Sequence, residues 1–94
     1  MEKIGKKEKV MEKEKEIGRV THYFDKVGVA VIELKAKLNV GNDIHIKGAT
    51  TDFVQEVDSM QVEHKKIAEA KKGEAIGLKT LEKVRPNDTV YLVS

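Results

Sequence analysis

The chain has 94 residues, and its 18 Lys and Arg nearly balance its 16 Asp and Glu. This length fits one domain, and a net charge of +2 does not by itself indicate a nucleic-acid-binding protein. The absence of cysteine excludes disulfides and thiolate metal sites and favours a reducing, cytoplasmic setting. No apolar run approaches the roughly 18 residues of a membrane span, so we expect a protein without a membrane partner. Abundant Lys and Glu with few Asn and Gln are typical of a thermophile.

Residues 1–16 differ in composition from the rest of the chain. They hold six Lys, five Glu and only four apolar residues, which are too sparse for a buried helical stripe. We therefore expect a charged N-terminal tail that is disordered or a frayed helix. A basic arm that contacts RNA is the alternative interpretation.

From residue 17 onward, apolar and polar residues alternate as in β-strands. Residues 29–34 are apolar at nearly every position, which predicts that this strand is covered on both faces at its start. Residues 65–72 have a helix-forming composition but span only about two turns, so we expect a single helical turn or an irregular connection there. Phe24 and Phe53 are expected in the core. The predicted strands are residues 17–24, 29–34, 43–47, 53–57, 60–64, 75–80 and 89–93.

The turn at residues 41–43, Gly-Asn-Asp, introduces one of these strands. Gly and Asn tolerate positive φ, and Asp caps its own backbone. The strand that follows places Ile44 and Ile46 on one face and polar side chains on the other. The same succession of turn and short strand recurs at residues 73–78 and 86–93. Six to seven such strands predict an all-β fold, a small closed antiparallel β-barrel formed by residues 17–94.

The order of these pieces resembles the second domain of the translational GTPases, the β-barrel that follows the G domain in elongation factor Tu and initiation factor 2. A similar barrel is found at the C-terminus of collagenase-like peptidases associated with RNA modification, and residues 59–61 and 84–88 are more like that version. The chain has no Gly-x-x-x-x-Gly-Lys-Ser/Thr phosphate loop, so the resemblance implies a barrel without the GTPase domain. The matching segments are residues 18–20, 27–31, 38–43, 57–62, 70–78 and 84–90.

In elongation factor Tu this barrel helps to hold the aminoacylated end of tRNA with one acidic and one basic residue. The resemblance places these two positions at Gln61 and His64. Gln61 retains hydrogen-bonding capacity without the charge, and His64 has an imidazole in place of a permanently charged basic side chain.

No residue pattern indicates catalysis, a metal or a cofactor. His22, His45 and His64 lack the short spacing of a zinc site, and Ser59 is not in a Gly-x-Ser-x-Gly turn. Residues 50–52, Thr-Thr-Asp, lie close to His45 in sequence, but we interpret them as a loop whose side chains cap the backbone. We therefore predict that the chain is not an enzyme.

A modest patch for RNA phosphates, with one ring for stacking, is the candidate site, and a merely solubilising surface is the alternative. We predict a non-catalytic binding module for RNA or a ribonucleoprotein surface such as the ribosome, in translation or RNA modification. The alternative is a protein-interaction module that docks onto an enzyme in another chain. The oligomeric state and the particular RNA or protein are left open. The residues predicted to contact RNA are Arg19, Tyr23, Lys47, Gln61, His64, Lys65 and Lys66.

Overall fold

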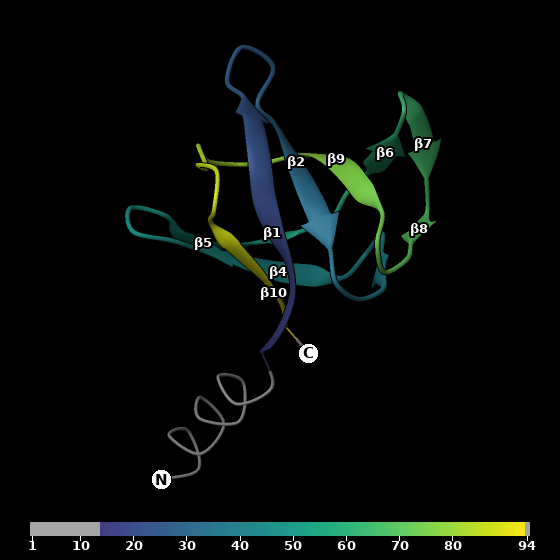
Figure 1. Cartoon of the computed structure of the whole chain (residues 1–94), viewed down its shortest axis with the longest axis horizontal. Helices are drawn as coiled ribbons and strands as arrows, with labels where there is room; N and C mark the ends of the chain where they lie inside the picture. The colour runs from purple at the N-terminus through teal and green to yellow at the C-terminus, as the bar shows by residue number, and fades with distance from the viewer. Residues whose placement is uncertain (1–13, 94) are drawn as a thin grey trace, which may run out of the picture.

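The computed structural model describes residues 14–93, which form ten β-strands (Figure 1). The N-terminal tail was predicted for residues 1–16, and residues 1–13 of it lie outside the described residues. Lys15 and Glu16 belong to the first strand and not to a tail. The strands are β1 Lys15–Phe24, β2 Val29–Leu34, β3 Leu38–Asn39, β4 Asp43–Lys47, β5 Asp52–Glu56, β6 Met60–Val62, β7 Lys65–Ile67, β8 Glu69–Ala70, β9 Ala75–Lys79 and β10 Thr89–Val93.

Eight of these strands form one antiparallel sheet in the order β5-β4-β10-β1-β2-β9-β6-β7, and β3 pairs with β8 separately. The predicted all-β antiparallel class is therefore confirmed. The closed barrel is not found as a continuous ladder, because no backbone pairing joins β5 to β7 within residues 14–93.

The helical turn expected in residues 65–72 is wrong. This segment forms β7, which pairs with β6, and β8, which pairs with β3. Two turns of helix would leave most of their backbone groups without intrahelical partners, whereas pairing with neighbouring strands supplies partners at once. The described part of the chain therefore has more strands than the six to seven predicted.

Gln55 links the two sides of the sheet where the ladder is open. Its side chain is only 7% exposed. The side-chain amide donates a hydrogen bond to the carbonyl of Lys79 at 3.0 Å, and its oxygen accepts one from the backbone N–H of Leu81 at 2.8 Å. A single side chain thus connects β5 to the end of β9.

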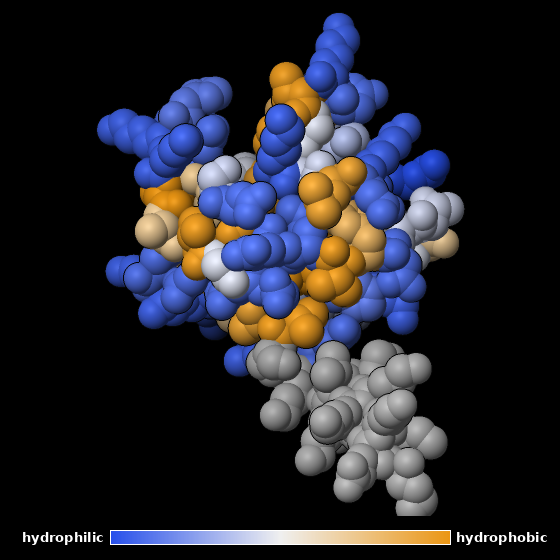
Figure 2. Space-filling view, turned by 180° about the vertical axis from the view of Figure 1, so that it is seen from behind, coloured by the Kyte–Doolittle hydropathy of each residue, from blue (hydrophilic) through white to orange (hydrophobic). Residues whose placement is uncertain are grey.

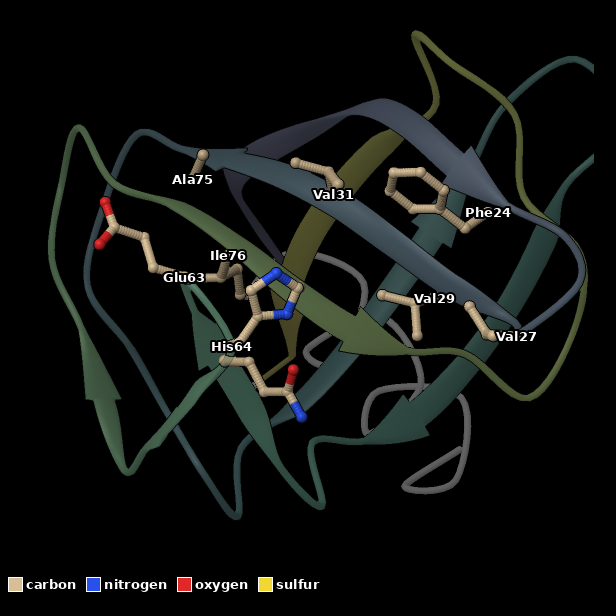
Figure 3. A pocket seen from close by; sticks show the side chains of 10 residues that line it. Phe24, Val27, Val29, Val31, Glu63, His64, Ala75 and Ile76 are labelled. Carbon is tan, nitrogen blue, oxygen red and sulfur yellow. The ribbon is translucent and has the colours of Figure 1, made fainter.

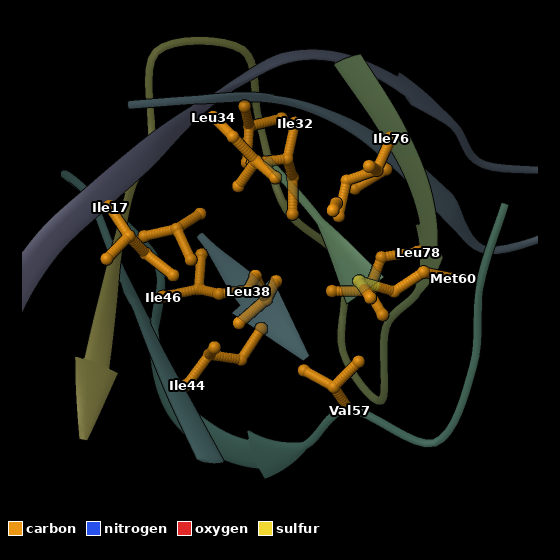
Figure 4. Packing of buried hydrophobic residues seen from close by; sticks show 14 of the residues in the cluster. Ile17, Ile32, Leu34, Leu38, Ile44, Ile46, Val57, Met60, Ile76 and Leu78 are labelled. Carbon is orange, nitrogen blue, oxygen red and sulfur yellow. The ribbon is translucent and has the colours of Figure 1, made fainter. Parts of the chain in front are cut away.

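The core lies on the inner face of the curled sheet (Figure 4). Ile44 and Ile46 are fully buried there, as the alternation of residues 43–47 predicts. Ala30 and Ile32 of β2 face the same core. The buried cluster consists of Ile17, Val20, Ala30, Ile32, Leu34, Leu38, Ile44, Ile46, Val57, Met60, Ala70, Ile76, Leu78, Val84 and Val90.

Phe24 is not part of this core, although its place in the alternation predicted that it would be. The pairing of β1 with β2 shifts register between Val20 and His22, as at a β-bulge. One extra residue in a strand reverses the faces of the residues that follow it. Phe24 is consequently 50% exposed, whereas Phe53 packs partly buried against the core.

The Gly-Asn-Asp turn has the backbone conformation that its sequence predicts. Gly41 has φ of +97°, in the region that other residues rarely adopt. Its N–H donates to the carbonyl of Val57 at 2.9 Å, and the side-chain oxygen of Asn42 accepts from the N–H of Asn39 at 2.9 Å. The turn thereby fixes the start of β4 next to the end of β5.

Candidate functional site: an apolar hollow on the outer face

A hollow of about 560 Å³ lies on the outer face of the sheet, opposite the core (Figure 3). It spans the β1–β2 hairpin, β2, β9 and the turn between β6 and β7. Most of its wall is aliphatic or aromatic, and polar side chains stand only at one side. The lining residues are Phe24, Val27, Val29, Val31, Gln61, Glu63, His64, Ala75, Ile76 and Gly77.

The strand register explains why these residues lie together. Val31 pairs with His22 on one side and with Gly77 on the other. Gly77 in turn pairs with Gln61, and Gln61 pairs with Lys66. Directly paired residues in an antiparallel ladder lie on the same face. A single row therefore crosses β1, β2, β9, β6 and β7, with an imidazole at one end, an amide and an ammonium group at the other, and no side chain at Gly77.

The β1–β2 hairpin supplies the apolar wall. Phe24 pairs with Val29, and its ring lies 4.2 Å from the ring of His22, centroid to centroid, at an angle of 58°. Phe24 is 50% exposed and Val27 at the hairpin turn is 60% exposed. Exposed apolar residues that stand singly are ordinary on protein surfaces, but these adjoin Val29 and Val31 and form a continuous patch.

The turn between β6 and β7 is strained. Its two central residues, Glu63 and His64, have φ of +52° and +69°. A two-residue hairpin with positive φ at both positions usually has Asn-Gly there, and each other residue costs on the order of 1 kcal/mol. Figure 3 shows the His64 ring at the hollow and the Glu63 carboxylate directed away from it. Backbone strain of this kind is found more often at functional sites than elsewhere.

The structure gathers some of the predicted RNA-contacting residues here and separates the others. Gln61 and His64 line the hollow, and Lys66 continues the row beyond Gln61. Lys65 pairs with Val62, so it lies on the opposite face of β7 from Lys66.

The remaining three lie elsewhere. Arg19 forms an ion pair with Glu33 at 3.6 Å, and Tyr23 packs partly buried against the core. Lys47 lies on β4, which β10 and β1 separate from β2. The seven residues thus do not form one continuous patch.

A second cluster surrounds His45 on the outer face of β4. The imidazole is 12% exposed, with Nδ1 2.9 Å from a Glu14 oxygen and Nε2 2.5 Å from an Asp52 oxygen. Burial alone would lower the pKa of His45, but the hydrogen bonds with Asp52 and Glu14 outweigh it and raise the pKa above 6.5. The hydrogen bond from His45 in turn lowers the pKa of Asp52. The cluster fastens the residue before β1 to the strands β4 and β5.

Some features of these two sites can be predicted from the sequence. The nearly continuous apolar run at residues 29–34 predicts a strand covered on both faces at its start, but within residues 14–93 the outer side chains Val29 and Val31 are only half-buried and line the hollow. Asp52 was expected to cap the backbone, but its carboxylate contacts His45 instead. Glu14 carried no signal, because its neighbours are the alternating charges of the predicted tail.

No group of three or more metal-ligating side chains occurs in residues 14–93. No helix in this part of the chain is long and apolar enough to cross a membrane. Figure 2 shows a further face of the molecule, on which hydrophilic side chains surround smaller apolar patches.

The fold is similar to that of a domain whose structure has been solved. The structure superimposes on the C-terminal domain of a Geobacillus thermoleovorans protein assigned as a U32 peptidase, with a TM-score of 0.80 over 85% of this chain and 93% of that one. The two sequences are 16% identical, so this likeness concerns the fold alone.

Sequence relatives lie among proteins called proteases and collagenases. The chain is 51% identical over 79 residues to an uncharacterized protease of Methanocaldococcus jannaschii, covering 83% of this chain and 19% of that protein. It is 36% identical over 77 residues to a collagenase of Porphyromonas gingivalis, covering 80% and 21%. The chain thus spans about a fifth of the length of these curated relatives. No protein-family model matches the sequence.

These matches overturn the resemblance to the translational GTPases. The similar sequences and the similar fold belong to collagenase-like proteins and a U32 peptidase, and the description as translation-factor-like is wrong. The reason is that glycine-containing turns followed by alternating strands determine how a small β-domain folds. Such turns recur in unrelated β-domains, so they do not identify the family.

Proposed function

We propose that this chain is a non-catalytic binding module that docks against a protein through the hollow on its outer face. The observation that carries the proposal is the apolar outer side of β2, where Val29 and Val31 adjoin Phe24 and Val27. Outward positions of an antiparallel sheet in contact with water are usually polar. A contiguous apolar patch rimmed by polar groups is typical of an interaction site.

The partner we propose is the enzyme portion of a collagenase-like protein, on another chain or on the same polypeptide. The M. jannaschii relative supports this choice of partner. Its segment similar to this chain makes up about a fifth of that protein, so the relative has the segment and a much larger remainder on one polypeptide. An inter-domain contact would cover the second face of β2 that the sequence pattern predicts to be covered.

The non-catalytic part of the proposal is supported by the surroundings of His45. Both of its ring nitrogens contact carboxylates, so neither is left to activate a nucleophile. The lack of cysteine supports a cytoplasmic setting as part of the same proposal. We also propose that the curled sheet behaves as a barrel, with Gln55 closing it between β5 and the end of β9.

Hydroxyl-radical footprinting of the intact M. jannaschii relative tests the docking proposal. The reference is its segment that matches this chain, expressed alone. We expect the positions aligned with Phe24 and Val31 to be oxidised several-fold more slowly in the intact protein, and the position aligned with Val54 to be unchanged. Val54 is the matched control because it is 53% exposed on β5, away from the hollow. Equal oxidation of Phe24 and Val31 in both samples would reject docking through the hollow.

RNA contact through the β6–β7 hairpin is the second candidate function. It is supported by the grouping of Gln61, His64, Lys65 and Lys66 in one hairpin. Titration with total tRNA and with a short single strand, at low and moderate salt, tests it by NMR. We expect affinity to fall by about 0.7 log units per log unit of salt for each phosphate contact. We expect the charge reversal Lys65→Glu with Lys66→Glu to weaken binding further, and unchanged affinity in that variant would remove the hairpin as an RNA site.

A further inference from the structure

We propose that the hollow receives an apolar side chain of an acidic segment of the partner, and that the side formed by His64, Gln61 and Lys66 binds the carboxylate next to that side chain. This inference rests on the proposed docking function and specifies the chemistry of the partner.

The floor of the hollow is suited to an inserted side chain. Gly77 stands between Val31 and Gln61 in the row, so the sheet is bare at that point. A Cβ added at Gly77 would lie 3.6 Å from a methyl group of Val29, in ordinary van der Waals contact. An added carbon therefore fits above Gly77 without a clash. The hollow as a whole has a volume of about 560 Å³, within the roughly 300–1,000 Å³ of typical binding pockets.

The polar side of the hollow consists mainly of hydrogen-bond donors. The Gln61 amide, the His64 imidazole and the Lys66 ammonium group come from adjacent positions of β6, the turn and β7. Lys79 pairs with Val29 and so lies on the outer face at the other end of β9, beside the apolar wall. An amide, an imidazole and an ammonium group together can donate several hydrogen bonds to one carboxylate.

The acidic residues near the hollow are engaged or turned away. Glu33 pairs with Arg19 at 3.6 Å, and a carboxylate oxygen of Glu74 accepts a hydrogen bond from the N–H of Lys71 at 2.8 Å. The Glu63 carboxylate is directed away from the His64 ring (Figure 3). In the described residues, Lys66 and Lys79 have no ion-pair partner. The charge that complements this side is therefore negative.

The strained turn provides an independent reason to assign His64 to the site. Asn-Gly at these positions would relieve the positive φ of Glu63 and His64 but would remove the imidazole from the hollow. The chain has Glu63 and His64 in this turn instead, which makes the turn less stable but places the His64 imidazole at the hollow. We infer that His64 contacts the partner, because its ring lies at the hollow on a turn with positive φ.

Selection from a phage library of random twelve-residue peptides, against the immobilised chain, tests the proposed chemistry. Counter-selection uses Val31→Asp, and Val54→Asp is the matched control. We expect the enriched peptides to share an aliphatic or aromatic residue with Asp or Glu within two positions. A synthetic peptide of that consensus should bind at least tenfold more weakly to Val31→Asp and to Lys66→Glu, and equally well to Val54→Asp.

The outcomes separate this inference from the proposed function. Enriched peptides with Lys or Arg beside the apolar residue, or no enrichment over the Val31→Asp counter-selection, would overturn the inference. Protection of Phe24 and Val31 in the footprinting of the intact relative would still stand as support for docking. If Val31→Asp folds poorly, the peptide affinity of Lys66→Glu still tests the inference. Lys66 is exposed, so its substitution should not disturb the fold.

A double substitution tests the role of the turn. We expect Glu63→Asn with His64→Gly to raise the melting temperature by a few degrees and to weaken binding of the selected peptide several-fold. A more stable variant that binds the peptide as tightly as the parent chain would remove His64 from the site.

Discussion

Strands β4 and β2 belong to the same sheet but differ on their outer faces. Both face the core with fully buried isoleucines, Ile44 and Ile46 in β4 and Ile32 in β2. The outer side of β4 carries His45, which Glu14 and Asp52 hold from both sides. The outer side of β2 carries Val29 and Val31 beside a hollow. The polar group on the outer face of β4 thus has its partners within the chain, whereas the outer face of β2 carries the apolar hollow through which we propose docking.

The largest loss of stability should come from substitutions on the inner faces of β2 and β4. We expect the two inner faces to contribute equally to the free energy of unfolding. Ile32→Ala and Ile46→Ala each remove a fully buried side chain, so each should lower the free energy of unfolding by about 3 kcal/mol. Urea unfolding measures both. A loss below about 1 kcal/mol for Ile32→Ala alone would mean that β2 does not share the core with β4.

The next-largest loss of stability concerns the proposed closure of the sheet at Gln55. Gln55→Leu would leave the carbonyl of Lys79 and the N–H of Leu81 without their partner, which should cost about 2 kcal/mol. Chemical denaturation checks this, with Glu56→Gln on the exposed side of β5 as the control. If Gln55→Leu unfolds at the same denaturant concentration as the parent chain, the sheet is not closed by this side chain.

A smaller loss is expected at the turn that precedes β4. Gly41→Val introduces a β-branched residue at φ of +97°, so it should cost about 1–2 kcal/mol, more than Gly→Ala in an ordinary strand. Gly77→Ala is the matched control, because its added Cβ meets only ordinary contacts. Thermal unfolding compares the two. Equal melting temperatures for Gly41→Val and the parent chain would contradict the role of Gly41.

The outer face of β4 should make stability depend on pH. The raised pKa of His45 means that its contribution is fully present below pH 6.5 and is lost as the pH rises through the folded-state pKa. The loss should stay within about 1 kcal/mol, since Asp52 is largely exposed. Urea unfolding between pH 6 and pH 9 measures it. His45→Gln should remove this component, and an identical pH dependence in the variant would assign it to other groups.

The smallest effect is expected on the outer face of β2. Val31→Thr should change the free energy of unfolding of the chain alone by less than about 0.5 kcal/mol, as should Val54→Thr on exposed β5. Calorimetry of the two variants checks this. A loss of 2 kcal/mol or more for Val31→Thr would show that Val31 packs within this chain, and the contrast with β4 would disappear.

Strands β4 and β2 also show which features of the sheet can be predicted from the sequence and which cannot. The alternation at residues 43–47 predicted both faces of β4 correctly, because period two follows directly from strand geometry. The apolar run at residues 29–34 predicted a second covered face for β2. In the structure the outer side chains of β2 are only half-buried, and the pattern within one strand does not identify the group that would cover them.

Other features depend on contacts between distant residues. The bulge between Val20 and His22 turns Phe24 outward, and the pairing of β1 with β2 sets it rather than any turn residue. Glu14 reaches His45 across 31 positions of the sequence. The prediction of RNA-contacting residues rests on their charge and on the family resemblance, neither of which includes the order of the strands. That order separates Lys47 on β4 and Arg19 on β1 from the β6–β7 hairpin.

Photo-cross-linking in the intact M. jannaschii relative tests the central claim most directly. A benzoylphenylalanine would replace the residue aligned with Val31 in one variant and the residue aligned with Val54 in the other. Docking through the hollow predicts cross-links from the Val31 position into the four-fifths of that protein outside the matching segment, and few from the Val54 position. Absence of such cross-links from the Val31 position, or equal yields from both, would contradict docking through the outer face of β2.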